Sequence, residues 1–182
     1  MSEFLRKYGM GEAYRIRAQL LLIESLKKDL SLEKVCEFPP EPVSLDYPEQ
    51  LNWISTEDPN CDADLLFTWR SFKQRVMRMR NEFPGRYLMF MGTNMLNPGV
   101  IFQKLYGKER EHYVRIRDLQ ALCHRLRLKI VRKGFYDSPL WLDAPLPYGL
   151  HLPLARPGKW RIMELMPGKL IRAHHVYVVG RR

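Results

Sequence analysis

Cysteine is scarce in this sequence of 182 residues, and long apolar runs are missing from it. The three cysteines, Cys36, Cys61 and Cys123, form no CxxC pair and lack Cys/His spacing, which argues against a disulfide framework and against a zinc site. No apolar run approaches the roughly 20 residues that span a bilayer. Residues 1–17 also lack the apolar core of a signal peptide. We therefore expect buried free thiols, no metal, no membrane contact and a cytoplasmic location.

Signatures of covalent catalysis and of phosphate binding are also missing. The sequence has no Ser/His/Asp, Cys/His or phosphate-loop motif. Two glycines, Gly9 and Gly11, precede a predicted helix, but they do not follow a strand and so fail the context test for a dinucleotide loop. The composition is that of an ordinary globular protein, 46% hydrophobic and 27% charged. We therefore expect one core in a single domain over residues 1–182.

Charge is abundant and unevenly distributed, with a formal net charge of +10. Residues 33–64 carry nine acids against one base, whereas residues 104–133 carry ten bases against three acids. If each segment forms its own face, the molecule is electrostatically two-sided, which favours a homodimer or a constitutive protein partner. Two interpretations of the basic segment stay open: a solvated face, or a surface for the phosphates of a nucleic acid. Such phosphate contacts would come from Arg115, Arg117, Arg125, Arg127, Arg132 and Lys133.

Hydrophobic periodicity predicts one helix near the start of the chain, over residues 10–30. Its apolar residues recur every three or four positions and form one stripe of Ile16, Leu20, Ile23, Leu26 and Leu30. The charged residues lie mostly outside that stripe; they are Arg15, Arg17, Glu24, Lys27 and Lys28.

Helices and buried strands then alternate along the chain. Strands are expected near 34–38, 64–69, 86–91, 129–135 and 173–179, and helices over 72–83 and 117–128. Residues 41–48 and 51–56 offer short strands at most, whereas 92–99 and the proline-rich segment 137–158 are predicted to be loops. This alternation predicts an α/β fold, with a mostly parallel sheet and helices packed on it.

Several segments from residue 62 onward, about two thirds of the chain, resemble class I S-adenosylmethionine-dependent methyltransferases. Residues 62–69 are similar to the fourth strand of that fold, and 84–91 to its proline-glycine turn and fifth strand. Residues 119–131 resemble the late helix and sixth strand, and 174–181 the antiparallel last strand. Asn94 with residues 97–99 resembles the loop after the fifth strand in some archaeal members. The resemblance implies a Rossmann-like sheet, reduced in size here, with an antiparallel terminal strand.

The front end of the chain departs from this family. Glu37 matches the acid that ends the first strand, but the family's glycine-rich cofactor loop is replaced by Phe38-Pro-Pro-Glu-Pro42, and no glycine follows before Gly85. Glycine lets a backbone approach a cofactor closely, and proline has no N–H to offer it. Asp46 is either the ribose-binding acid after a shortened second strand or an acid of a surface loop. We therefore expect no cofactor, and S-adenosylmethionine only if the chain is an enzyme.

Other candidate site residues belong to predicted loops; they are Asn94, Asn97, Asp137 and Trp141. Asn94 follows the strongest predicted strand, at the carboxyl end where open α/β sheets bind ligands, and Asp137 precedes the proline-rich loop that contains Trp141. Asn94 is equally an ordinary turn former, and Trp141 either lines a pocket or anchors its loop. His174 and His175 are neighbours on a predicted strand, so their side chains should point to opposite faces.

Three functions remain open after the sequence is read. The chain is a methyltransferase-like domain that is degenerate at the cofactor site and acts as a partner or scaffold, an active methyltransferase with an unusual or partner-completed site, or a basic nucleic-acid-binding module. The fold does not decide among them, because function depends on the site.

Overall fold

The computed structural model describes residues 2–48, 50–69, 73–96, 113–136 and 175–182. In chain order its elements are α1 (Ser2–Leu30), β1 (Val35–Glu37), α2 (Pro42–Leu45), β2 (Ile54–Ser55), β3 (Leu65–Thr68), α3 (Lys73–Glu82), β4 (Tyr87–Asn94), β5 (Tyr113–Val114), α5 (Ile116–Arg125), β6 (Lys129–Tyr136) and β7 (His175–Arg181).

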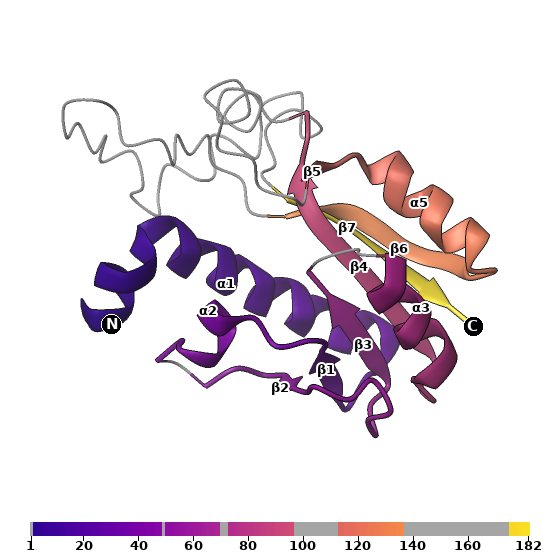
Figure 1. Cartoon of the computed structure of the whole chain (residues 1–182), viewed down its shortest axis with the longest axis horizontal. Helices are drawn as coiled ribbons and strands as arrows, with labels where there is room; N and C mark the ends of the chain where they lie inside the picture. The colour runs from indigo at the N-terminus through magenta and orange to yellow at the C-terminus, as the bar shows by residue number, and fades with distance from the viewer. Residues whose placement is uncertain (1, 49, 70–72, 97–112, 137–174) are drawn as a thin grey trace.

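The seven strands form one sheet in the order β2-β1-β3-β4-β7-β6, and β5 pairs with the carboxyl end of β4. Strands β2, β1, β3 and β4 are parallel, and β7 runs antiparallel between β4 and β6 (Figure 1). Every residue of β3 and β4 is buried, because near-continuous apolar strands are covered on both faces. The predicted α/β fold, a mostly parallel Rossmann-like sheet with an antiparallel terminal strand, is confirmed.

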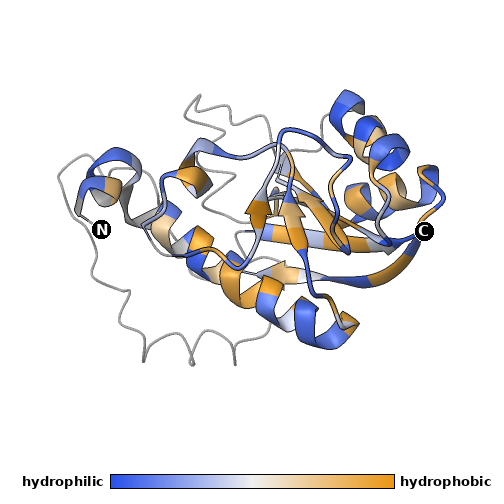
Figure 2. Cartoon of the chain, turned by 90° about the horizontal axis from the view of Figure 1, so that it is seen from below, coloured by the Kyte–Doolittle hydropathy of each residue, from blue (hydrophilic) through white to orange (hydrophobic). Residues whose placement is uncertain are grey.

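Helices cover both faces of this sheet. Alternate residues of each strand point to opposite faces, so Phe67 and Met89 pack in one apolar cluster with α1, whereas Leu66 and Leu88 pack in a second with α3 and α5. Figure 2 shows largely apolar strands between helices that carry their hydrophilic residues on the outside. Within the described residues, the carboxyl and amino edges of the parallel strands are therefore the parts of the sheet that helices do not cover.

Helix α1 begins at Ser2, earlier than the predicted residue 10. Its apolar stripe lies against the sheet, and Ile16, Ile23 and Leu26 are at most 1% exposed. It covers one face of the sheet, and the homodimer expected from the distribution of charge stays a prediction. No helix in the described part of the chain has the length and apolarity to cross a bilayer.

Two segments differ from the prediction. Pro42–Leu45 is a short helix and not a strand, because proline fits the first turn of a helix, where its missing N–H is not needed. Strand β4 continues to Asn94, into the predicted loop 92–99, because Gly92 and Thr93 pair with Val176 and His175 of β7. The first difference arises because the prolines of residues 41–48 indicate at most a short strand in the sequence alone. The second arises because Gly92 indicates the start of a loop there.

Candidate functional site

The carboxyl edge of the sheet gathers polar and aromatic side chains from six strands. Strands β1, β2, β3, β4 and β6 end there and β7 begins there; the terminal residues at this edge are Glu37, Ser55, Thr68, Asn94, Tyr136 and His175. This is the edge at which open α/β sheets bind ligands. All of these side chains except that of Ser55 are buried.

Glu37 is fully buried and its carboxylate accepts three hydrogen bonds. Ser44 Oγ donates to Oε1 at 3.1 Å, while Trp53 Nε1 and Ser55 Oγ each donate to Oε2 at 3.1 Å. Burial raises the pKa of Glu37 to about 7, the nearby Glu41 carboxylate adds to this, and the Trp53 hydrogen bond opposes it. Glu37 is therefore a carboxyl group that titrates near neutrality and whose two oxygens are already bound by the protein.

The segment after Glu37 closes this carboxyl off from the edge. The backbone N–H of Phe38 donates to the carbonyl of Phe67 at 2.9 Å, and the side chain of Phe38 is buried. Pro39 and Pro40 have no N–H, and the next residues turn into α2, which brings Ser44 onto Glu37. A nucleotide cofactor needs free N–H groups and an accessible acid at this position. The residues at the end of β1 therefore do not fit S-adenosylmethionine.

A buried ion-pair cluster lies beside Glu37. Arg15 of α1 is 5% exposed and binds Glu41 Oε2 at 2.9 Å and Glu12 Oε2 at 2.6 Å. Burial lowers the pKa of Arg15, but the Glu41 and Glu12 carboxylates outweigh it and the net pKa is raised. The guanidinium also lies 4.5 Å from the ring centroid of Trp69, a cation–π geometry. Arg15 lies outside the apolar stripe of α1 in the sequence, but in the structure its side chain is buried by these tertiary contacts.

Aromatic rings continue this cluster toward β6 and β7. The ring centroid of His175 lies 4.6 Å from that of Trp69 and 5.3 Å from that of Tyr136. The ring centroid of Tyr136 in turn lies 6.2 Å from that of Tyr177. Together with Arg15, these rings fill the carboxyl edge over β3, β7 and β6 with the chain's own side chains.

The remaining predicted site residues have separate positions. Asp46 follows α2 and not β2, is exposed, and accepts hydrogen bonds from Lys7 and Tyr8. The pKa of its carboxyl is lowered, chiefly by the bond from Lys7. Asn94 ends β4, is 1% exposed, and accepts the backbone N–H of Leu96 at 3.1 Å, as a turn former does. The other candidates lie outside the described residues; they are Asn97, Asp137, Trp141 and His174.

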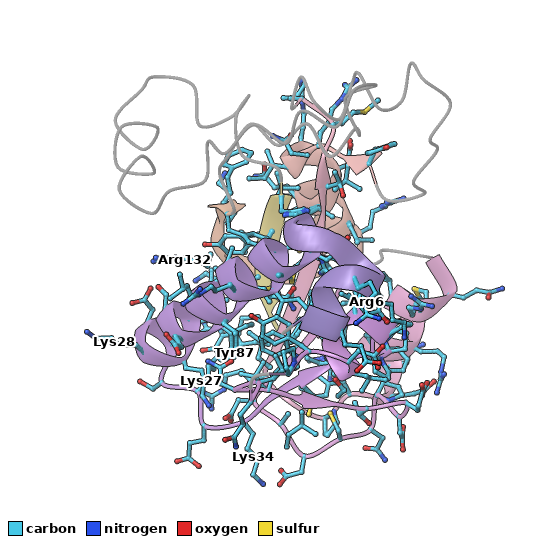
Figure 3. The ribbon with its side chains drawn as sticks, turned by 90° about the vertical axis from the view of Figure 1, so that its left-hand side faces the viewer. Arg6, Lys27, Lys28, Lys34, Tyr87 and Arg132 are labelled. Atoms are coloured by element: carbon cyan, nitrogen blue, oxygen red, sulfur yellow. The ribbon has the colours of Figure 1, made fainter. Side chains whose placement is uncertain are left out.

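The predicted basic residues do not form one cluster. Arg115 and Arg117 lie at the start of α5, and Arg125 and Arg127 at its end, about 15 Å away for a helix of this length. Arg132 of β6 instead pairs with Asp29 of α1 at 3.0 Å, beside the end of α1 that carries Lys28 (Figure 3). Lys133 is exposed on β6, at the edge of the sheet.

The acidic segment 33–64 likewise does not present all of its acids to solvent. Two are buried, Glu37 and Glu41. Asp62 pairs with Lys34, and Asp64 accepts the backbone N–H groups of residues 33 and 34. Much of this negative charge therefore serves internal contacts, and the predicted acidic face is smaller than the sequence indicates.

The positions of the strands confirm the resemblance to class I methyltransferases at the level of the fold. The segments assigned to the fourth, fifth, sixth and last strands of that family are β3, β4, β6 and β7. They lie side by side in the sheet in the order β3-β4-β7-β6, with β7 antiparallel as the resemblance implied.

Comparisons with known proteins give likeness in structure only. No protein-family model and no curated protein matches the chain. Similar solved structures include the methyltransferase domain of bacterial CtHen1-CN, at 7% identity and a TM-score of 0.49, over 90% of this chain and 97% of that one. A SAM-dependent methyltransferase from Archaeoglobus fulgidus has 11% identity and a TM-score of 0.45, over 88% and 80%. Magnesium protoporphyrin IX methyltransferase from Synechocystis PCC 6803, with bound SAH, has 9% identity and a TM-score of 0.40, over 76% and 53%. At these scores the likeness carries no argument about ligand or reaction.

Proposed function

We propose that this chain is a methyltransferase-like domain that binds no S-adenosylmethionine of its own and acts as a non-catalytic partner or scaffold. The observation that carries the proposal is the enclosure of Glu37. Its side chain is fully buried, and Ser44, Trp53 and Ser55 occupy both carboxylate oxygens. An acid that holds a cofactor must instead leave at least one oxygen open to the ligand.

Binding a cofactor through Glu37 would require the protein to break these contacts. Hydrogen bonds to a charged group contribute about 1.5–3 kcal/mol each, so freeing even one oxygen removes a large part of the affinity of an ordinary ligand. The neighbouring positions along the edge are filled by Arg15 and Trp69, which are themselves buried. Cofactor binding would therefore have to displace an ion pair as well as a carboxylate.

Calorimetric titration of the whole chain with S-adenosylmethionine, and separately with S-adenosylhomocysteine, tests this proposal. We expect no saturable heat for either ligand up to about 1 mM, which corresponds to a binding free energy weaker than about −4 kcal/mol. The Glu37→Gln variant is the matched control, since it keeps the shape of the side chain and should give the same result as the wild type.

A low-micromolar dissociation constant, about −8 kcal/mol, would refute the proposal. If Glu37→Gln also lost that affinity, Glu37 would be the residue that holds the cofactor, and the hypothesis of an active methyltransferase would replace that of a scaffold. Binding that survives in Glu37→Gln would also contradict the proposal and would place the ligand elsewhere on the carboxyl edge.

A further inference from the structure

Six basic side chains meet at the amino edge of the parallel strands, opposite the candidate site. They form what we call the basic rim, which consists of Arg86, Arg125, Arg127, Lys129, Arg181 and Arg182. Arg86 precedes β4, Lys129 begins β6, and Arg181 ends β7. Arg125, Arg127 and Lys129 belong to the basic segment 104–133, whereas Arg86, Arg181 and Arg182 come from separate segments that the sequence does not connect to it.

Strand register brings these segments together. Arg181 lies opposite Tyr87 on one side and opposite Lys129 on the other. The backbone N–H of Arg182 donates to the carbonyl of Arg86 at 3.1 Å. Figure 1 shows the C-terminal end of β7 beside the turn from α5 to β6, which carries Arg127. The rim is therefore continuous across three strands and one helix end.

The charges of the rim are not balanced within the described part of the chain. None of the six side chains makes an ion pair within 4 Å there, but Arg86 is close enough to Asp64 to help lower the pKa of that carboxyl. Arg182 donates to the carbonyls of Met79 and Arg80, and the other four side chains have no acidic partner among the described residues. Lys129 and Arg181 are direct cross-strand neighbours, an arrangement in which like charges destabilise a sheet. Helix C-termini favour cations, which accounts for Arg125 at the end of α5 and for Arg182, which donates to carbonyls at the end of α3. It does not account for Lys129 and Arg181, which belong to strands.

The backbone of Arg127, one residue of the rim, has a strained conformation. Its φ is 55°, in the left-handed region, where the residue after a helix is usually glycine. The N–H of Leu128 donates to the carbonyl of Cys123, and that of Arg127 to His124, so the backbone follows the helix-ending motif that glycine suits best. An arginine held in this conformation is tolerated at a cost in stability, and its position places one more cation on the rim.

We propose that the basic rim binds the phosphate backbone of a nucleic acid duplex without reading its sequence. Five of the six side chains are arginines, whose planar guanidinium groups bind phosphate oxygens in pairs. The rim contains no aromatic side chain on which an unpaired base would stack, so a duplex fits it better than a single strand. The exposed large apolar residues of the described chain lie elsewhere, at Leu21, Leu45, Ile54, Met77 and Leu96, which disfavours a membrane surface.

This inference is independent of the proposed lack of a cofactor. The rim and the candidate site lie at opposite ends of β4, an eight-residue strand that spans on the order of 25 Å. A failure of one proposal therefore leaves the other intact, and the two are measured with different ligands.

Fluorescence anisotropy of labelled 20-base-pair RNA and DNA duplexes, titrated with the whole chain over a series of salt concentrations, tests the rim. The rim variant carries Arg125→Gln, Arg127→Gly and Lys129→Gln. The matched control carries Arg6→Gln, Arg17→Gln and Arg117→Gln, three exposed arginines outside the rim. Each triple variant lowers the formal net charge from +10 to +7, since 10 − 3 = 7.

We expect the wild type to bind duplexes with a dissociation constant of about 10⁻⁴–10⁻⁶ M at physiological salt and with a steep salt dependence. The rim variant should bind at least tenfold more weakly, and the slope of log K against log[salt] should become shallower by about 1 for each charge removed. The control variant should keep most of the wild-type affinity and most of the wild-type slope. The single variant Arg127→Gly should bind duplexes more weakly and yet unfold at an equal or higher temperature, because glycine suits the backbone conformation at position 127. Weaker binding by this variant could then not be attributed to unfolding.

Three results would overturn the proposal. One is no binding by the wild type at low salt. Another is an equal loss in the rim and control variants, because that pattern indicates attraction to net charge alone. The last is rim-dependent binding to vesicles of anionic phospholipid with none to either duplex, which would make the partner a membrane.

Discussion

Replacing Glu37 with glutamine should stabilise this protein above neutral pH and leave its stability nearly unchanged in acid. The carboxyl of Glu37 is fully buried and its pKa is raised from 4.5 to about 7 by burial and by Glu41. A raised pKa means that the folded state holds its proton more tightly than the unfolded state does. The folding free energy that this proton contributes is therefore present below about pH 4.5 and is lost as the pH rises to about 7.

The size of the effect follows from that difference in pKa. At about 1.36 kcal/mol for each pH unit, a rise from 4.5 to about 7 corresponds to about 3 kcal/mol lost between acid and neutral pH. Glutamine removes the titration and keeps the contacts. Its amide oxygen can accept from Trp53 and Ser55, and its amide nitrogen can donate to Ser44, whose hydroxyl rotates to accept.

Urea unfolding at several pH values between 4 and 9 measures this difference directly. We expect the free energy of unfolding of Glu37→Gln to exceed that of the wild type by up to about 3 kcal/mol at pH 8 and to match it near pH 4. Subtracting one curve from the other removes the contribution of the titrating groups that do not interact with Glu37. A difference that is independent of pH, or a variant less stable at pH 8, would show that Glu37 is not a buried carboxyl with a raised pKa.

Two further predictions concern packing around the same sheet. Arg15→Met should lower the free energy of unfolding by about 3–5 kcal/mol, because it leaves Glu41 buried without its cation. Adding Glu41→Met should restore most of that loss. An unchanged thermal unfolding temperature in the single variant would count against a buried ion pair. Gly180→Ala should cost about 1–3 kcal/mol, because its Cβ would lie 2.8 Å from Cβ of Leu128. The double variant with Leu128→Ala serves as the control for crowding there, and a Gly180→Ala protein as stable as the wild type would contradict that contact.

The sequence was informative about the sheet because the sheet is built from local apolar runs. Residues 64–69 and 86–91 are apolar enough to predict β3 and β4 without any tertiary information. The end of β4 was missed because Gly92 and Thr93 are held by β7, which lies more than 80 residues away in the chain. Pairing of that kind leaves no signal in a short window of sequence.

The candidate site was harder to predict because its polar residues are defined by their partners. Arg15 has the helical position of a solvent-facing residue and is buried only because Glu41 and Trp69 meet it. The two serines and the tryptophan that enclose Glu37 belong to segments predicted as short strands or turns. Glu37 itself was found through the resemblance to the family, as the acid that ends the first strand, whereas its burial depends on residues 44 to 55 folding back over it.

Strand β7 also sets the order in which this chain can complete its fold as it is synthesised. Among the described residues, strands β4 and β6 do not pair with each other, and β7, at residues 175–181, pairs with both. Until those residues have left the ribosome, the two strands each have an open hydrogen-bonding edge, and such edges invite pairing with other chains. The nascent protein therefore carries this risk of aggregation for as long as residues 175–181 are unavailable, and a chaperone that covers the free edge of β4 during that time should raise the yield of folded molecules.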